Sequence, residues 1–208
     1  MLKRGGLAMN RRVLSIKILE RCLYFLFLYS PGAGRMAVYN VHERLLPVAA
    51  DRAGALLDTL ARPGAQDRLW PHRSWPAMAF DRPLGVGAAG GHGPVRYTVV
   101  AHVPALWVRF AFDGPRGFHG FHEYAVLPAG PGEPGTLLRH TLAMRATGPA
   151  RLSRPLVWRP LHDALIEESL DRAERSCAGA VARPARRGPY TRLLRALARR
   201  LAGRNPLG

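Results

Sequence analysis

Cysteine is nearly absent from this chain of 208 residues, since only Cys22 and Cys177 occur and they lie far apart. They make no metal-ligand spacing and no disulfide framework, so we expect a reduced, cytoplasmic setting. Lysine is equally rare, with 2 residues among the 31 basic ones. The arginine excess, together with 22 glycines and 18 prolines, fits a GC-rich coding bias as well as it fits nucleic-acid binding.

The sequence also lacks an apolar run of the about 20 residues that a bilayer-spanning helix needs. The longest run near the N-terminus, Cys22–Tyr29, follows several basic residues. A signal peptide fits poorly, because Glu20 abuts the run and no convincing cleavage site follows. The favoured interpretation is that translation starts at Met36. Residues 1–35 are then an N-terminal extension outside the mature fold.

Acidic residues are missing from residues 179–208, which hold eight arginines and carry a net charge of +8. Residues 36–178, in contrast, hold sixteen arginines and thirteen acids, so the total charge of +17 sits mainly in the two ends. Positive and negative charges are therefore nearly balanced in the middle segment, and we expect no specific nucleic-acid partner.

The basic tail, residues 180–208, contains a short amphipathic helix over 190–201. One helical face collects the apolar residues Tyr190, Leu193, Leu194, Leu197 and Leu201. Two interpretations stay open. The helix either makes a weak contact with an anionic membrane, which makes the protein membrane-peripheral, or it is a solvated tail whose leucines touch the domain or a partner. The second is favoured, because one short helix binds membranes weakly.

The middle segment, residues 36–179, is predicted to be one domain. Alternation predicts a strand over 38–48, and helical spacing predicts a helix over 49–62. Later segments with a period of two predict strands over 95–103, 106–112, 118–127 and 136–146, and helical spacing predicts a helix over 161–177. The acids Asp163, Glu167, Asp171 and Glu174 of that helix are assigned to its solvent side.

The turns between these strands predict their register. Centring each turn pairs Val103 with Leu106, Phe112 with Phe118 and His122 with His140. All strands then share one apolar face, which includes Ala101, and Glu123 lies opposite Arg139 on the polar face. An antiparallel sheet with one apolar face needs a cover, and the helix at 161–177 supplies it.

Three segments resemble a known superfamily: Asp67–Pro71 (DRLWP), Gly87–Tyr97 (GAAGGHGPVRY) and Leu161–Glu167 (LHDALIE). They are similar to a largely uncharacterised bacterial branch of the SRPBCC superfamily, the START-related and polyketide cyclase-like helix-grip proteins. Over Val38–Cys177, the resemblance implies an α+β helix-grip fold, in which a curved antiparallel sheet wraps on a long C-terminal helix around an internal cavity. It also implies binding of a small hydrophobic or amphipathic molecule, with a polyketide cyclase or aromatase-like enzyme as the alternative.

Three histidines are expected at this cavity: His122 and His140 from the sheet and His162 from the helix. They could bind zinc, act as general acid and base, or be satisfied by hydroxyls and water; no metal and no cofactor is the favoured expectation. Glu43 is a further candidate base if it faces inward with Val41 and Leu45; the alternative is that it pairs with a nearby arginine or lies at a strand edge. The predicted cavity residues are Trp70, Tyr97, Val99, Val108, Phe110, Phe118, His122, Tyr124, His140, Leu142, His162, Leu165 and Ile166.

Overall fold

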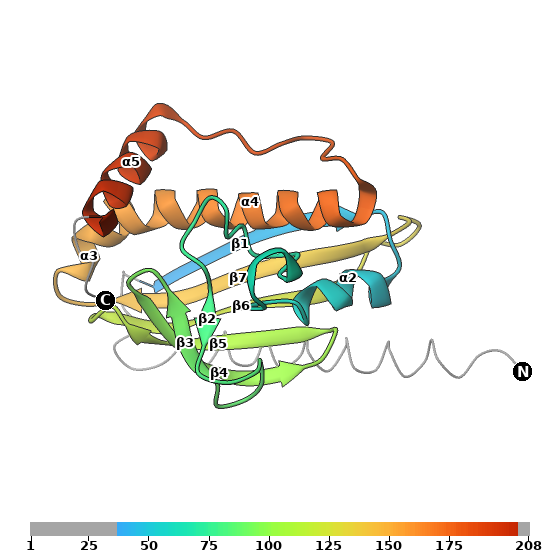
Figure 1. Ribbon diagram of the computed structural model, residues 1–208, viewed down its shortest axis with the longest axis horizontal. Helices are drawn as coiled ribbons and strands as arrows, with labels where there is room; N and C mark the ends of the chain where they lie inside the picture. The colour runs from blue at the N-terminus through green and yellow to red at the C-terminus, as the bar shows by residue number, and fades with distance from the viewer. Residues whose placement is uncertain (1–36, 204–208) are drawn as a thin grey trace, which may run out of the picture.

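The computed structural model describes residues 37–203 (Figure 1), so the predicted extension at 1–35 lies outside the described residues. Seven strands form: β1 (Ala37–Leu46), β2 (Ala79–Phe80), β3 (Ala89–His92), β4 (Val95–Val103), β5 (Trp107–Gly114), β6 (Phe118–Pro128) and β7 (Thr136–Ala146). The helical elements are α2 (Ala50–Leu57), η1 (Gly64–Gln66), α3 (Ala150–Ser153), η2 (Arg154–Trp158), α4 (Arg159–Ala178) and α5 (Pro189–Gly203). None of the helices within 37–203 combines the length and apolarity needed to cross a bilayer.

The strands make one antiparallel sheet in the order β1-β7-β6-β5-β4-β3-β2. Strand β1 therefore pairs with the last long strand, β7, and forms one edge of the sheet. Helix α4 runs along this part of the sheet, α2 lies below the C-terminal half of α4 against β6 and β7, and α5 leans on the N-terminal end of α4 (Figure 1). The predicted α+β class and the helix-grip architecture are confirmed.

The predicted register holds in part. Tyr97 pairs with Phe112 and Val99 with Phe110, as expected. A bulge follows Val99, because the β4–β5 turn carries Ala105 in the left-handed region at φ 58° and takes one residue more than the two-residue turn assumed. The prediction for Ala101 is therefore wrong, since this residue packs with Trp107 on the opposite face.

The pairings of β6 are shifted by two residues from the prediction. His122 lies opposite Phe110 and Leu142, and His140 lies opposite Tyr124. Because side chains alternate along a strand, a shift of two leaves each side chain on its predicted face. His122 and His140 are both buried on the inner face, although they are not direct partners.

The outer face of the sheet corrects two further expectations. Glu123 is buried and accepts hydrogen bonds from Arg109 Nε at 2.7 Å and Trp107 Nε1 at 2.9 Å, instead of facing Arg139. Arg139 donates to Glu43 at 2.6 Å. Glu43 is exposed, because the even-numbered residues of β1 face α4 and the odd-numbered ones face outward. The prediction that Glu43 is an inward base is wrong.

The main core fills one half of the space between sheet and α4. Helix α2 and the segment Asp67–Pro71, called here the Trp70 segment, occupy this half together with the C-terminal half of α4. Tyr124 Oη lies 2.9 Å from Ser169 Oγ, which donates in turn to the carbonyl of Leu69 at 3.1 Å. These bonds join sheet, loop and helix, so this half is closed by packed side chains.

Candidate functional site

The other half of this space is hollow. A cavity of about 260 Å³, called here the histidine cavity, lies between the inner face of the sheet and the N-terminal half of α4. Its wall is mostly apolar and rich in aromatic rings, with Trp70, Trp75, Phe112, Phe118, Leu142, Met144, Trp158 and Leu165 among its members. Ala198 of α5 adds to the wall, so the tail helix closes part of this cavity.

The structure divides the predicted cavity residues into two groups. Trp70, Phe118, His122, His140, Leu142, His162, Leu165 and Ile166 border the cavity. Among the described residues, a second group lies in the packed core beside it instead: Tyr97, Val99, Val108, Phe110 and Tyr124. The sequence pattern placed these residues on the correct face, but it could not show that α2 and the Trp70 segment cover that part of the sheet.

His122, His140 and His162 form a row along the cavity. The ring centroids of His122 and His140 are 5.6 Å apart, and those of His140 and His162 are 5.1 Å apart. Four of their nitrogens are buried and have no hydrogen-bond partner within the described part of the chain: His122 Nε2, both nitrogens of His140, and His162 Nε2. Burial holds the pKa of His122 and of His140 well below 6.5, so both rings are neutral at pH 7.

His92 is a further cavity residue, from β3. Its Nδ1 lies 3.1 Å from Tyr97 Oη, and its ring packs on Trp70 with 4.7 Å between centroids. Burial lowers the pKa of His92 to about 3. From the sequence, the glycine-rich connection Gly87–Gly93 is expected at the mouth of the cavity with His92 facing the opening, and the structure places His92 in the cavity wall.

One side of α4 carries a row of acids that faces β1, called here the acid ladder: Asp163, Glu167, Asp171 and Glu174. Asn40 Nδ2 donates to Asp163 at 2.7 Å, and His42 Nδ1 lies 2.7 Å from Glu167. Arg44 Nη1 lies 2.9 Å from Asp171 and 2.5 Å from Glu174. The assignment of these acids to the solvent side is wrong, because the edge strand β1 presents polar side chains to them.

Two sequence signals could have found the acid ladder. The acids recur at positions i, i+4, i+8 and i+11, which lie on one side of a helix. Asn40, His42 and Arg44 alternate along β1, so they share one face. The apolar residues Val41 and Leu45 predict the opposite orientation of β1, and the structure shows that they lie on its outer face.

The acid ladder decides the protonation of His42. Burial alone would lower its pKa, but the hydrogen bonds to Asp163 and Glu167 outweigh burial and raise the pKa of His42 to about 9. Burial opposes ionisation of Asp163, yet its hydrogen bonds to His162 and His42 bring its pKa below the usual range. For His162, burial outweighs the bond to Asp163 and lowers its pKa.

Helix α5 docks through an arginine. Arg195 is buried: its guanidinium donates to the carbonyl of Ser74, lies 3.4 Å from Glu168, and stacks over the Trp75 ring at 4.7 Å. Tyr190, Leu193 and Leu197 are left exposed at 51%, 57% and 46%. Leu193 and Leu197 are therefore available for contact with a partner or a membrane, the two alternatives that the sequence leaves open. Leu201 lies beyond the described side chains.

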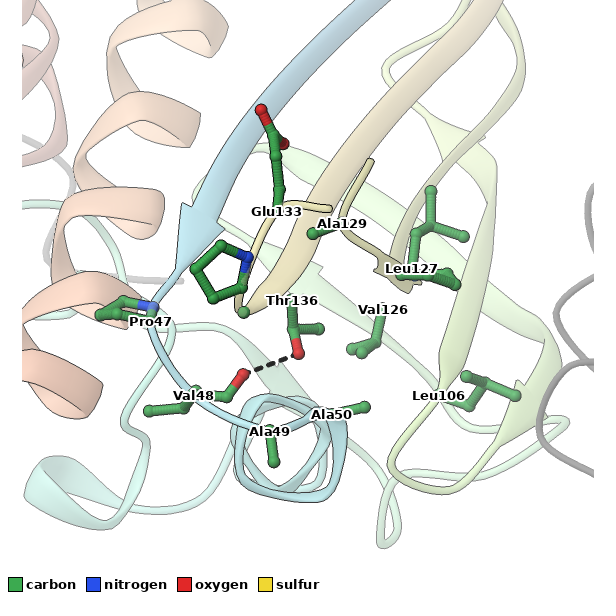
Figure 2. A pocket seen from close by; sticks show the side chains of 13 residues that line it. Pro47, Val48, Ala49, Ala50, Leu106, Val126, Leu127, Ala129, Glu133 and Thr136 are labelled. Atoms are coloured by element: carbon green, nitrogen blue, oxygen red, sulfur yellow. Dashed lines mark hydrogen bonds between the residues drawn. The ribbon is translucent and has the colours of Figure 1, made fainter. Parts of the chain in front are cut away.

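A second hollow lies at the far end of the sheet. Figure 2 shows this open depression of about 780 Å³ between the β1–α2 connection and the β6–β7 loop. Thr136 Oγ1 donates to the Val48 carbonyl at 2.8 Å across its floor (Figure 2). Its lining is apolar apart from Glu133 and Thr136, so it offers no cluster of groups for chemistry.

A curved antiparallel sheet that grips a long C-terminal helix around a cavity defines a helix-grip protein. This is the fold of the SRPBCC superfamily, and the chain has it. No protein-family model matches the sequence, and no curated protein matches it either.

Several solved structures are similar to this chain at low sequence identity. The di-domain ARO/CYC protein BexL from the BE-7585A biosynthetic pathway has 14% identity and a TM-score of 0.50, over 88% of this chain and 63% of that chain. A conserved Enterococcus faecalis protein of unknown function, EF2215, has 13% identity and a TM-score of 0.48, over 88% and 96%. Norcoclaurine synthase from Thalictrum flavum, solved with dopamine and hydroxybenzaldehyde, has 13% identity and a TM-score of 0.47, over 64% and 84%. At such identities the likeness concerns the fold alone.

Proposed function

We propose that this protein binds a small amphipathic molecule in the histidine cavity. The observation that carries the proposal is the set of buried imidazole nitrogens on His122, His140 and His162 that lack a partner among residues 37–203. Leaving a buried polar group unpaired costs about 1–3 kcal/mol, and a hydroxyl or carbonyl of a bound molecule recovers that energy. Such a molecule needs an apolar body for the wall and at least one polar group for the histidines.

The size and lining of the cavity limit this molecule further. A volume of about 260 Å³ lies just below the usual range for ligand pockets, about 300–1,000 Å³, which favours a compact molecule. The walls include the rings of Trp70, Trp75 and Trp158. Aromatic walls favour a flat, ring-containing ligand, because offset and edge-to-face ring contacts add to the burial of apolar area.

An enzyme of the polyketide cyclase or aromatase type is the alternative, and one contact favours it. His162 Nδ1 lies 3.2 Å from Asp163 Oδ1, so the carboxylate selects the tautomer in which Nδ1 carries the proton. Nε2 of His162, which has no partner in the described chain, is then free to accept a proton from a bound molecule. BexL, an ARO/CYC protein by name, has the same fold.

Binding can be tested with 2-naphthol, a compact aromatic alcohol, by following the tryptophan fluorescence of the protein. We expect saturable binding, and we expect His140→Phe to weaken it at least about 10-fold, because the phenyl ring removes the polar partner and keeps the volume filled. Arg139→Gln is the matched control, since this neighbouring residue lies on the outer face and should leave binding unchanged. Equal losses in both variants, or no saturable binding by the wild type, would contradict the proposal. Native mass spectrometry of the purified protein would then identify any molecule that co-purifies.

A second function is supported by the orientation of α5. We propose a weak contact with anionic membranes through the exposed side chains of Leu193 and Leu197, together with the exposed part of Tyr190. The hydroxyl of Tyr190 donates to the carbonyl of Leu156, so the exposed Leu152 and Leu156 lie at the same end of the molecule. Residues 179–208 carry no acid, and this positive charge complements anionic lipid.

Vesicle sedimentation tests the membrane contact. The full chain should bind phosphatidylcholine vesicles only when they contain phosphatidylglycerol, and the double variant Leu193→Gln/Leu197→Gln should lose this binding. Ala196→Gln is the control, since it changes an exposed residue of the same helix that is not part of the apolar face. Equal retention of the double variant and the wild type would overturn the proposal.

A further inference from the structure

His42, His162 and Asp163 present three metal-ligand atoms to one point. Their donor atoms all lie within 4.8 Å of one another. Asp163 Oδ1 is the central atom of the three, at 3.4 Å from His42 Nε2 and 3.2 Å from His162 Nδ1. The three residues come from β1 and from the first turns of α4, so the fold brings them together from distant parts of the sequence.

These distances are long for hydrogen bonds between charged groups, which are about 2.7–2.9 Å. They are close to the edge of a zinc coordination tetrahedron. Bonds of about 2.0–2.2 Å from Zn²⁺ to nitrogen and oxygen give ligand-to-ligand separations of about 3.3–3.5 Å. The two distances to Asp163 Oδ1 thus match edges of such a tetrahedron, and His42 and His162 present their donor atoms within 4.8 Å of each other.

The surroundings of His42 and Asp163 match those of metal ligands. His42 uses Nδ1 for Glu167, at 2.7 Å, which leaves Nε2 directed at Asp163. A metal-binding histidine commonly has its second nitrogen held by a carboxylate in this way. Asn40 Nδ2 donates to Asp163 Oδ1 at 2.7 Å and fixes the carboxylate.

We infer that His42, His162 and Asp163 form a binding site for a divalent transition-metal ion, with Zn²⁺ as the best match to two imidazoles and one carboxylate. Three protein ligands leave a fourth position, as in zinc sites that bind an exogenous group. Asn40 and His162 also border the histidine cavity, so the site lies at its polar edge. A ligand with an oxygen donor, such as a phenol or a carboxylate, is the chemical class that this position would take.

The test is a calorimetric titration of the full chain, freed of metal with EDTA and then dialysed, with Zn²⁺. One equivalent should bind tightly, and Asp163→Asn and His42→Gln should each weaken the binding about 100-fold or more. Glu167→Gln should weaken it by about 10- to 100-fold, the usual effect of losing a carboxylate that orients a ligand. Asp171→Asn is the matched control, because this acid is on the same ladder but outside the group of three, and it should leave the affinity unchanged. Circular dichroism establishes that each variant is folded.

Titration with Co²⁺ supplies a second readout, since a tetrahedral site produces intense visible absorption bands that an octahedral surface site does not. The bands should appear with one equivalent of Co²⁺ and be absent in His42→Gln. Zn²⁺ binding of equal strength in the wild type and in His42→Gln, or no binding by the wild type, would overturn the inference. The 2-naphthol titration is run in EDTA, so failure of ligand binding and failure of metal binding are separate results.

Discussion

His42 and His140 lie opposite each other on β1 and β7, yet in the metal-free protein His42 is protonated at pH 7 and His140 is neutral. His42 lies beside Asp163 and Glu167, which raise its pKa to about 9. His140 faces the cavity with no partner for either nitrogen among the described residues, and burial holds its pKa well below 6.5. Two neighbouring histidines thus differ in charge: His42 is charged at the edge of the sheet, and His140 is neutral in the interior.

The difference shows that α4 has two distinct sides. Its acid ladder holds the edge strand β1 by charge, while Leu165 and Ile166 present apolar surface to the cavity and the core. The charge of a buried histidine therefore depends on which side of α4 it meets, rather than on depth of burial alone. Each prediction below removes one side of this comparison.

The largest effect should come from Arg44→Met, which removes the cation shared by Asp171, Glu174 and Glu167. Breaking one partner of a buried ion-pair network leaves uncompensated charge, and we expect the free energy of unfolding to fall by about 4 kcal/mol. Urea denaturation measures the change. Glu43→Gln is the control on the same strand, because its ion pair with Arg139 is on the outer face and is worth at most about 1 kcal/mol. Similar losses in the two variants would show that the acid ladder does not hold the strand.

The alkaline limit of stability should depend on His42 in the metal-free protein. The groups that face this imidazole are Asp163, Glu167 and His162 of α4 and His140 of β7. Because its folded pKa of about 9 is above the unfolded value of 6.5, its contribution is fully present below pH 6.5 and is lost as pH rises through 9. We expect about 3 kcal/mol to be lost over this window. Urea denaturation from pH 6 to 9.5 in EDTA should show this fall in the wild type and a flat profile in His42→Gln.

The acid limit should depend on the neutral histidines. The pKa of His122 is depressed in the folded state, so its contribution is present above pH 6.5 and is lost as pH falls below that value. Protonation of this residue in the unfolded chain should cost the wild type about 2 kcal/mol at pH 5. His122→Leu should remove this part of the acid sensitivity, whereas His119→Leu, at an exposed position of the same strand, should not. A His122→Leu profile as steep as that of the wild type would contradict the assignment.

The smallest effect should come from His140→Phe. The substitution removes two unpaired buried nitrogens and adds an apolar ring of similar shape, so we expect the free energy of unfolding to change by less than about 1 kcal/mol. His42→Phe at the opposing position should be far more damaging, because it leaves Asp163 and Glu167 without their imidazolium. Chemical denaturation of both variants compares the two histidines directly, and equal destabilisation would remove the distinction between them.

Much of the fold could be predicted from the sequence because alternation decides the face of each strand. His122 and His140 reached the correct face although their pairing was wrong by two residues, and Tyr97 and Val99 were placed correctly up to the bulge. The bulge itself depends on the turn at Ala105, whose conformation no local pattern in the sequence indicated. Fold class and the covering helix followed from the single apolar face of the sheet.

The polar part of the site could not be predicted in the same way. His42 and Asp163 contact each other only because β1 pairs with β7, which is distant in the sequence, and so forms the edge of the sheet beneath α4. An acidic stripe on a helix ordinarily indicates a solvated side, and only the pairing of β1 turns it into an interior contact. The inversion of Glu43 has the same cause, since Val41 and Leu45 are apolar residues on the exposed side of an edge strand.

The contribution of Ala198 to the cavity wall links the tail to occupancy of the cavity. A molecule that fills this space contacts α5, so binding and docking of the tail must stabilise each other to the same extent, by thermodynamic reciprocity. The linker at 183–189 should therefore be cut more slowly by trypsin when the cavity is full, so the proteolytic half-life measures the occupancy of the cavity.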